Sequence, residues 1–193
     1  MKKTITLLSI LLLTRVASMA QAEEGRWRII AGAGFPNIPA LVLTNVDKSS
    51  GPYQLGFKKF ISEKVNWGIV YSFSSAQTKP EIFLNSGGNS FVVNYEATFA
   101  TLLGNLDYTW KNSKKYNLYS GIALGFVAVS ATANITSGTG DAPKLTAANS
   151  GFAYHITAIG AHRTFGDSRI GGYAELGFGS NGFLSLGLSY SIH

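Results

Sequence analysis

The segment that most constrains the fold is the last one, residues 169–193, in which apolar and small polar residues alternate almost without interruption. The dipeptide Asn181-Gly182 separates its two runs, and Asn-Gly between alternating runs is a strong indication of a β-hairpin. Because neighbouring side chains of a strand point to opposite faces, one face of the second run is apolar and the other is small and polar. The pattern favours a membrane barrel strand, with lipid on its apolar side and a packed interior on its serine and glycine side. The apolar side consists of Leu184, Leu186, Leu188, Tyr190 and Ile192.

The beginning of the chain predicts an export signal rather than a part of the fold. Residues 1–3 are basic at two positions, residues 5–13 are apolar, and Ala20-Gln21-Ala22 is a small-x-small cleavage site. The apolar run is too short for a membrane-spanning helix, which needs about 20 residues. We therefore expect a signal peptide at 1–22, export through the Sec pathway and a single mature domain at 23–193.

Composition narrows the class of the mature domain. Charged residues make up 13% of the chain, against about 25% in typical soluble domains. The 22 glycines and the 12% of aromatic residues suit a sheet with close backbone approaches. The absence of cysteine excludes a disulfide framework and a thiolate metal site. The Lys and Arg residues form no stripe of the kind that binds nucleic acid, so we expect no nucleic-acid partner and no cofactor.

The same alternation recurs along the chain and predicts eight strands joined in sequence order. Their connections alternate between long and short, with only the last long position replaced by the short turn at 180–182. Long outer loops and short periplasmic turns are typical of transmembrane barrels. The predicted fold class is therefore all-β, an eight-stranded antiparallel up-and-down transmembrane β-barrel preceded by a cleaved signal peptide. We expect long loops at 36–51, 75–90 and 130–150, and short turns at 62–64, 111–115 and 166–168.

One predicted strand, residues 91–110, does not keep a single apolar phase. Its later apolar residues have the opposite parity to its earlier ones, and the change falls between Thr101 and Gly104. A one-residue change of phase is what a β-bulge produces. We therefore expect a bulge at this point, with four earlier residues facing outward: Phe91, Val93, Tyr95 and Phe99.

Charged residues on the small, polar faces are the candidates for a functional site. Side chains fill the interior of an eight-stranded barrel, and buried charges must be paired because isolated ones cost several kcal/mol each. We interpret these residues as a structural plug, with a narrow path for protons or small solutes as the alternative. The expected lumen cluster is Arg28, Lys58, Asp107, His155, Arg163 and Glu175.

Aromatic residues gather near the strand ends that adjoin the predicted short turns. Aromatic rings of this kind concentrate at membrane–water interfaces. We expect an interfacial girdle, with packing in the core as the alternative. The residues are Trp27, Trp67, Tyr108, Trp110 and Tyr116.

Two further interpretations stand beside the plugged membrane barrel. His155, Thr157 and Glu175 carry the groups of a nucleophilic triad, which would make the chain an outer-membrane enzyme that hydrolyses or transfers lipid A acyl groups. Threonine is an uncommon nucleophile away from an N-terminus and no flanking motif supports it, so we expect no enzyme. A soluble ligand-binding barrel is the second alternative, but its outward face would need more charges than this sequence has.

Taken over the whole mature chain, the sequence resembles the small eight-stranded outer-membrane β-barrel proteins of Gram-negative bacteria, of the OmpA/OmpX type and the porin-like barrel-domain family. The most specific part is the barrel-assembly signal of polar-x-Gly-x-x-apolar-x-apolar, which Ser185, Gly187, Tyr190 and Ile192 match. This chain ends in His193, where the signal usually has an aromatic residue.

The resemblance implies a place in the outer membrane among its lipids and lipopolysaccharide, and recognition by the barrel-assembly machinery. It also implies extracellular loops that serve surface interaction or envelope maintenance, with an extracellular ligand as a possible partner. It supplies no activity.

Overall fold

The computed structural model describes residues 25–37, 45–84, 90–113, 116–137, 140–141, 145–166 and 168–192. The predicted signal peptide at 1–22 lies outside these residues. No helix in the described part of the chain is long and apolar enough to cross a membrane. The described residues form ten strands: β1 (Trp27–Phe35), β2 (Val46–Phe60), β3 (Val65–Thr78), β4 (Glu81–Leu84), β5 (Ser90–Asn112), β6 (Tyr116–Ser137), β7 (Gly140–Asp141), β8 (Leu145–Thr164), β9 (Ile170–Gly179) and β10 (Leu184–Ile192).

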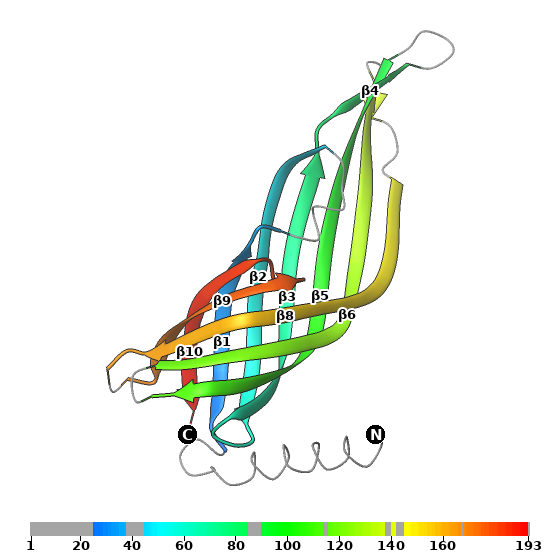
Figure 1. The fold of residues 1–193 in the computed structure, drawn as a ribbon. Coiled ribbons are helices and arrows are strands. Elements are labelled where there is room, and N and C mark those ends of the chain that lie inside the picture. Colours follow the sequence, from blue (N-terminus) through cyan, green and yellow to red (C-terminus); the bar gives the residue numbers. More distant parts are fainter. Residues whose placement is uncertain are drawn as a thin grey trace, which may run out of the picture.

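Eight of the strands in the described ranges close an antiparallel barrel (Figure 1). Around the ring their order is β1, β2, β3, β5, β6, β8, β9 and β10, and the ring closes because the first and last strands pair, with Trp27 opposite Ile192. The short strand β4 pairs with β5 and the short strand β7 pairs with β6, and neither takes part in the ring. The predicted all-β, eight-stranded up-and-down barrel is confirmed.

The barrel strands have two different lengths. β1, β9 and β10 contain 9, 10 and 9 residues, close to the number that crosses a membrane. β2, β3, β5, β6 and β8 contain 15, 14, 23, 22 and 20 residues. Their extra length lies at the end opposite the short turns and forms the sheet that rises to the upper right in Figure 1. The wall is therefore closed in its lower part and continues upward as an open, curved sheet.

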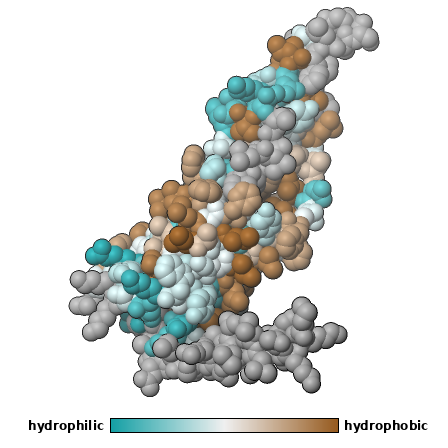
Figure 2. Space-filling model, viewed as in Figure 1, coloured by the Kyte–Doolittle hydropathy of each residue, from teal (hydrophilic) through white to brown (hydrophobic). Residues whose placement is uncertain are grey.

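Large apolar side chains cover the outer wall of the ring. In β3, Trp67, Ile69 and Tyr71 are exposed, whereas Gly68 and Val70 between them are buried. Figure 2 shows apolar residues gathered over the middle of the molecule, with hydrophilic residues at its lower left end and in its upper part. Soluble monomers rarely expose contiguous apolar patches larger than a few hundred Å². A wall of this kind needs apolar surroundings.

The long connections are shorter than predicted because strands continue into them. β2 begins at Val46, inside the predicted loop 36–51, and β3 runs to Thr78, inside the predicted loop 75–90. β6 and β8 together take up most of the predicted loop 130–150. Above the ring the outward apolar alternation ends while backbone pairing continues, so the outward pattern does not reveal these strand extensions. The predicted turns 62–64 and 166–168 fall between strands, whereas Lys111 and Asn112 of the predicted turn 111–115 belong to β5.

The bulge predicted in β5 at residues 101–104 is wrong. The pairing of β5 with β3 is continuous from Tyr108 to Glu96. Val93 and Phe99, which were predicted to face outward, are buried on the concave face, where Phe99 packs with two alanines. Tyr95 is exposed, and the side chain of Phe91 lies outside the described part of the structure. The apolar phase changes because the upper half of the sheet has its apolar side on the concave face, not because the backbone is irregular.

A bulge does occur in β8. Thr157 pairs with Gly177 and Ile159 with Leu176, which leaves Ala158 without a partner in β9. Ala158 and Ile159 are therefore both exposed. A one-residue shift moves every following side chain to the other face. The correction affects one predicted lumen residue: Arg163 is exposed on the outer wall, and His162 is buried in its place.

Candidate functional site

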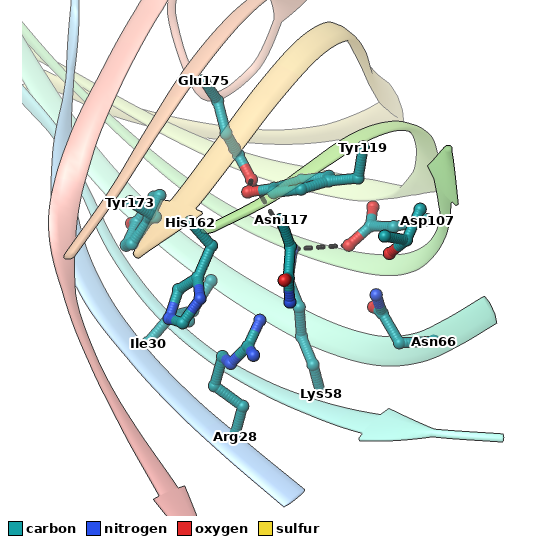
Figure 3. A pocket seen from close by; sticks show the side chains of 11 residues that line it. Arg28, Ile30, Lys58, Asn66, Asp107, Asn117, Tyr119, His162, Tyr173 and Glu175 are labelled. Atoms are coloured by element: carbon teal, nitrogen blue, oxygen red, sulfur yellow. Dashed lines mark hydrogen bonds and ion pairs between the residues drawn. The ribbon is translucent and has the colours of Figure 1, made fainter. Parts of the chain in front are cut away.

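The centre of the lumen is an ionic cluster contributed by strands from around the ring (Figure 3). Lys58 of β2 places its Nζ 2.7 Å from Oδ2 of Asp107 on β5 and 3.5 Å from Oε1 of Glu175 on β9. The hydroxyl of Tyr119 on β6 donates a hydrogen bond of 2.6 Å to the same Glu175 oxygen. The Lys58 ammonium group also lies 5.3 Å from the centroid of the Tyr119 ring. One lysine thus connects four strands of the wall.

Charge within this cluster is balanced by a second cation, Arg28 of β1. Its guanidinium carbon lies 4.7 Å from the centroid of the Phe60 ring, and its side chain lines the same cavity as Lys58, Asp107 and Glu175. All four charged residues are buried, with 4 to 6% of each exposed. Because a buried charge without a counter-charge costs several kcal/mol, two cations and two anions form the arrangement that this interior tolerates.

The space left between these side chains is very small. The cavity lined by the ionic cluster, His162 and Tyr173 has a volume of about 10 Å³. A cavity of that size holds about one water molecule. At this level the lumen is filled by side chains, and a solute larger than water has no room.

Further layers close the lumen above the ionic cluster. The side-chain amide of Gln54 donates to the carbonyl oxygen of Asn181 (3.1 Å) and to Oγ of Ser185 (3.0 Å). Ser185 in turn donates to the Asn181 carbonyl oxygen (2.9 Å). Apolar layers complete the filling of the described interior, and they consist of Leu103, Ala123 and Ala153, and of Ala76, Ala97 and Phe99.

The three groups of the hypothetical nucleophilic triad do not form one. His155, Thr157 and Glu175 are all buried in the lumen. Neither ring nitrogen of His155 has a hydrogen-bond partner in the described part of the protein, and Glu175 is engaged by Tyr119 and Lys58. A triad requires the base to be hydrogen-bonded to both its neighbours. The described residues also contain no group of three His, Cys, Asp or Glu side chains that could hold a metal ion.

Five of the six residues predicted for the lumen cluster lie inside the barrel, and Arg163 does not. The structure adds three buried participants that the prediction of the site omitted: Gln54, Tyr119 and His162. The inward parity of Gln54 and Tyr119 was visible in the sequence. The position of His162 was not, because it depends on the bulge at Ala158. His162 shares a hydrogen bond of 2.7 Å with Ser189.

The predicted girdle residues lie near the short-turn ends of their strands. Trp67, Tyr108, Trp110 and Tyr116 are exposed on the outer wall, while Trp27 is half-buried and stacks on Phe57 at a centroid distance of 4.5 Å. Their contact with a membrane interface stays a prediction.

In the terminal strand β10, the residues of the predicted assembly signal are placed on both faces. Ser185 is buried, Tyr190 is exposed and Ile192 is half-buried. Gly187 sits against Tyr173, whose Cε1 atom would lie 2.5 Å from an added Cβ. Gly187 therefore has a packing role of its own, while recognition of the signal stays a prediction.

A closed ring of eight antiparallel strands, filled inside and apolar outside, has the fold of the small outer-membrane β-barrels. The structure of Ail, the attachment invasion locus protein of Yersinia pestis, is similar at 15% sequence identity and a TM-score of 0.50, over 88% of this chain and 99% of Ail. A second structure of Ail, in complex with the heparin analogue sucrose octasulfate, is similar at the same identity and coverage with a TM-score of 0.47. No protein-family model and no curated protein matches this sequence.

Proposed function

We propose that this chain is an integral outer-membrane protein that binds an extracellular partner through the open upper half of its sheet, while its lumen serves as a structural plug. The apolar outer wall supports insertion into lipid, and the likeness to Ail supports the fold on which the proposal depends. The proposal includes export through the Sec pathway, assembly by the barrel-assembly machinery, and a place among phospholipid and lipopolysaccharide.

The observation that carries the binding function is the open edge of β8. β8 pairs with β6 from Leu145 onward, but its pairing with β9 begins only at His155. Within the described ranges, residues 145–153 therefore have a neighbouring strand on one side only. All residues from Leu145 to Phe152 are exposed. An edge of this kind presents backbone N–H and C=O groups to which an extended peptide can add as a further strand.

The sequence of this edge supports binding rather than protection. Proteins usually guard exposed strand edges with charged residues, lysine above all, or with proline. Residues 145–153 read LTAANSGFA and contain no charged residue and no proline. On the opposite side of the opening, β2 pairs with β3 between Val46 and Ser50, whereas the pairing of β2 with β1 begins at Tyr53. We propose that the partner binds between these two edges.

The test is adhesion of bacteria that express the protein to cultured epithelial cells. The variant Ala147→Lys/Asn149→Lys places two charges on the open edge, and we expect it to reduce adhesion to the level of cells without the protein. Ser130→Lys is the matched control, since Ser130 is exposed on β6, which is paired on both sides. Heat-dependent gel mobility verifies that each variant is folded. Equal adhesion by the wild type and the edge variant would overturn the proposal.

The plug is tested independently of the binding edge. We expect the purified protein to produce no stable openings in a planar bilayer, because the ionic layer leaves room for about one water molecule. Persistent conductance steps would overturn this part of the proposal. The acyl pattern of lipid A, measured by mass spectrometry with and without expression, is expected to be unchanged.

A further inference from the structure

Two cations lie on the outer wall at the short-turn end of neighbouring strands. Arg163 of β8 is exposed and pairs with Tyr116 of β6. Lys111 of β5 is also exposed, and its ammonium group lies 5.4 Å from the centroid of the Tyr116 ring. Both cations thus flank one exposed aromatic ring. They lie at the level of the girdle residues Trp110 and Tyr108, on strands that are adjacent in the ring.

The same three strands, together with Val65 of β3, line an open hollow further up the wall. It has a volume of about 500 Å³ and is lined almost entirely by apolar surface. Its residues include Leu106 and Tyr108 on β5, Ile122 on β6, and Ile156 and Ala158 on β8. The hollow exists because Ser120 and Ala158, two small residues, stand between these larger side chains.

The exposed backbone carbonyl group at the floor of the hollow is hydrogen-bonded within the wall, so the floor suits an apolar occupant. The bulge at Ala158 interrupts backbone pairing on the outer wall, and an unpaired backbone group facing hydrocarbon costs several kcal/mol. The hydroxyl of Ser120 donates a hydrogen bond of 2.5 Å to the Ala158 carbonyl oxygen. The serine thereby satisfies the exposed acceptor within the wall, and the surface presented outward is apolar.

We propose that the cations Lys111 and Arg163, together with the hollow over Ser120 and Ala158, form a binding site for one anionic glycerophospholipid of the membrane leaflet at the short-turn end. The phosphate lies against the two cations, and an acyl chain lies in the hollow. This inference rests on the proposed insertion into the membrane.

The spacing of the two parts fits this occupant. Ser120 lies four residues beyond Tyr116 along β6, which corresponds to about 13 Å at about 3.3 Å per residue. Headgroups occupy roughly 5 to 8 Å of each leaflet before the hydrocarbon begins. A phosphate at the level of Tyr116 therefore places the hollow within the hydrocarbon. Guanidinium and ammonium groups beside an aromatic ring suit a phosphate, because arginine binds it through two parallel hydrogen bonds and lysine as a point charge.

The experiment is native mass spectrometry of the purified protein, released from micelles that contain either phosphatidylglycerol or phosphatidylcholine. We expect the wild type to retain one phosphatidylglycerol molecule in preference to phosphatidylcholine. Lys111→Gln and Arg163→Gln are each expected to reduce this preference about five-fold, which corresponds to the roughly 1 kcal/mol that one cation contributes beside an anionic lipid surface. Ala158→Leu fills the hollow, and we expect it to lower retention of both lipids.

Two matched variants separate the site from general effects. Lys59→Gln removes a lysine that lies over Trp27 at 4.7 Å from the ring centroid, at the same end of the barrel. Ala31→Leu enlarges an exposed alanine of β1 that borders no described hollow. Both variants should behave like the wild type. Loss of the preference in Lys59→Gln, or its survival in the double variant Lys111→Gln/Arg163→Gln, would overturn the inference. A protein that does not insert into bilayers at all contradicts the proposed function, whereas one that inserts without lipid preference contradicts this inference alone.

Discussion

Removal of the Lys58 charge is the sharpest test of the plugged lumen. Lys58→Met keeps an unbranched side chain of similar length and deletes the cation that lies 2.7 Å from Asp107 and 3.5 Å from Glu175. Both carboxylates then stay buried without their shared counter-charge. Breaking a buried ion pair from one side costs about 3–5 kcal/mol. The adjoining cavity of about 10 Å³ admits a single water molecule, which is too little water to hydrate two carboxylates. We expect the free energy of unfolding to fall by about 3–5 kcal/mol.

The measurement is urea unfolding in detergent micelles, followed by tryptophan fluorescence and by heat-dependent gel mobility. Lys59→Met is the control, because Lys59 is the next residue along β2 and lies outside the ionic cluster. Its contact with Trp27 is worth at most about 1 kcal/mol. A loss below about 1 kcal/mol for Lys58→Met would refute the reasoning.

A quadruple variant separates the cost of an uncompensated charge from the value of the ion pairs. Arg28→Met/Lys58→Met/Asp107→Asn/Glu175→Gln removes both cations and both anions of the cavity and keeps similar side-chain volumes. Replacement of a whole buried ion network by neutral groups is often neutral or stabilising. We expect the quadruple variant to recover most of the stability that Lys58→Met loses. A quadruple variant as unstable as the single one would show that the ion pairs themselves stabilise the barrel.

Three further predictions concern individual positions. Gly187→Ala places a Cβ against the backbone carbonyl oxygen of Ala31 and 2.5 Å from Tyr173 Cε1, and we expect a loss of about 1–3 kcal/mol by overpacking. Tyr173→Leu in the same chain relieves only the contact with the ring and should restore a small part of the urea midpoint, which a role of Gly187 in assembly alone does not predict. Ser120→Ala removes the hydrogen bond to Ala158 and should lower the free energy of unfolding by about 0.5–1.5 kcal/mol, measured in the same way. Arg163→Gln should change the free energy of unfolding by less than about 0.5 kcal/mol, because the bulge in β8 places Arg163 on the outer wall. Arg28→Gln should lower it by more than about 2 kcal/mol, because Arg28 is buried within the ionic layer. A larger loss for Arg163→Gln than for Arg28→Gln would contradict the bulge.

The ring and most of its interior were predictable from the sequence because the apolar wall imposes a strict alternation. Asp107 stands between the outward residues Leu106 and Tyr108, and this alone places it in the lumen. The parity of the whole strand places Lys58 and Glu175 there as well. The alternation predicts which side chains face the lumen, but it does not predict which of them contact one another. The contact of Lys58 with Glu175 depends on the shape of the closed ring, since β2 and β9 are separated in it by β1 and β10.

The errors have one physical origin, which is that parity holds only where the backbone is regular and the apolar side faces outward. The backbone is irregular at Ala158, where β8 has its bulge, so the first condition fails there. Neither Ala158 nor Ile159 is a glycine or a proline, so the sequence gives no sign of the bulge at these residues and its parity predicts the wrong face for Arg163. Phe99 breaks the second, because it lies above the ring, where the concave side of the open sheet is the apolar one. An apparent change of phase in a long strand thus has two explanations, and only the neighbouring strands distinguish them.

The closed lower ring and the open upper sheet have different roles, although the same five strands run through both. Closure of the lower ring removes every free strand edge at that level, and the ionic, polar and apolar layers fill it, so it supplies the stability. Five strands then continue past the level at which β1, β9 and β10 end, and β8 acquires a free edge there at no cost to the ring. A free edge without charge or proline is a hazard for aggregation in a soluble protein. The rigid barrel fixes the position of the β8 edge, which remains open to a strand from another molecule.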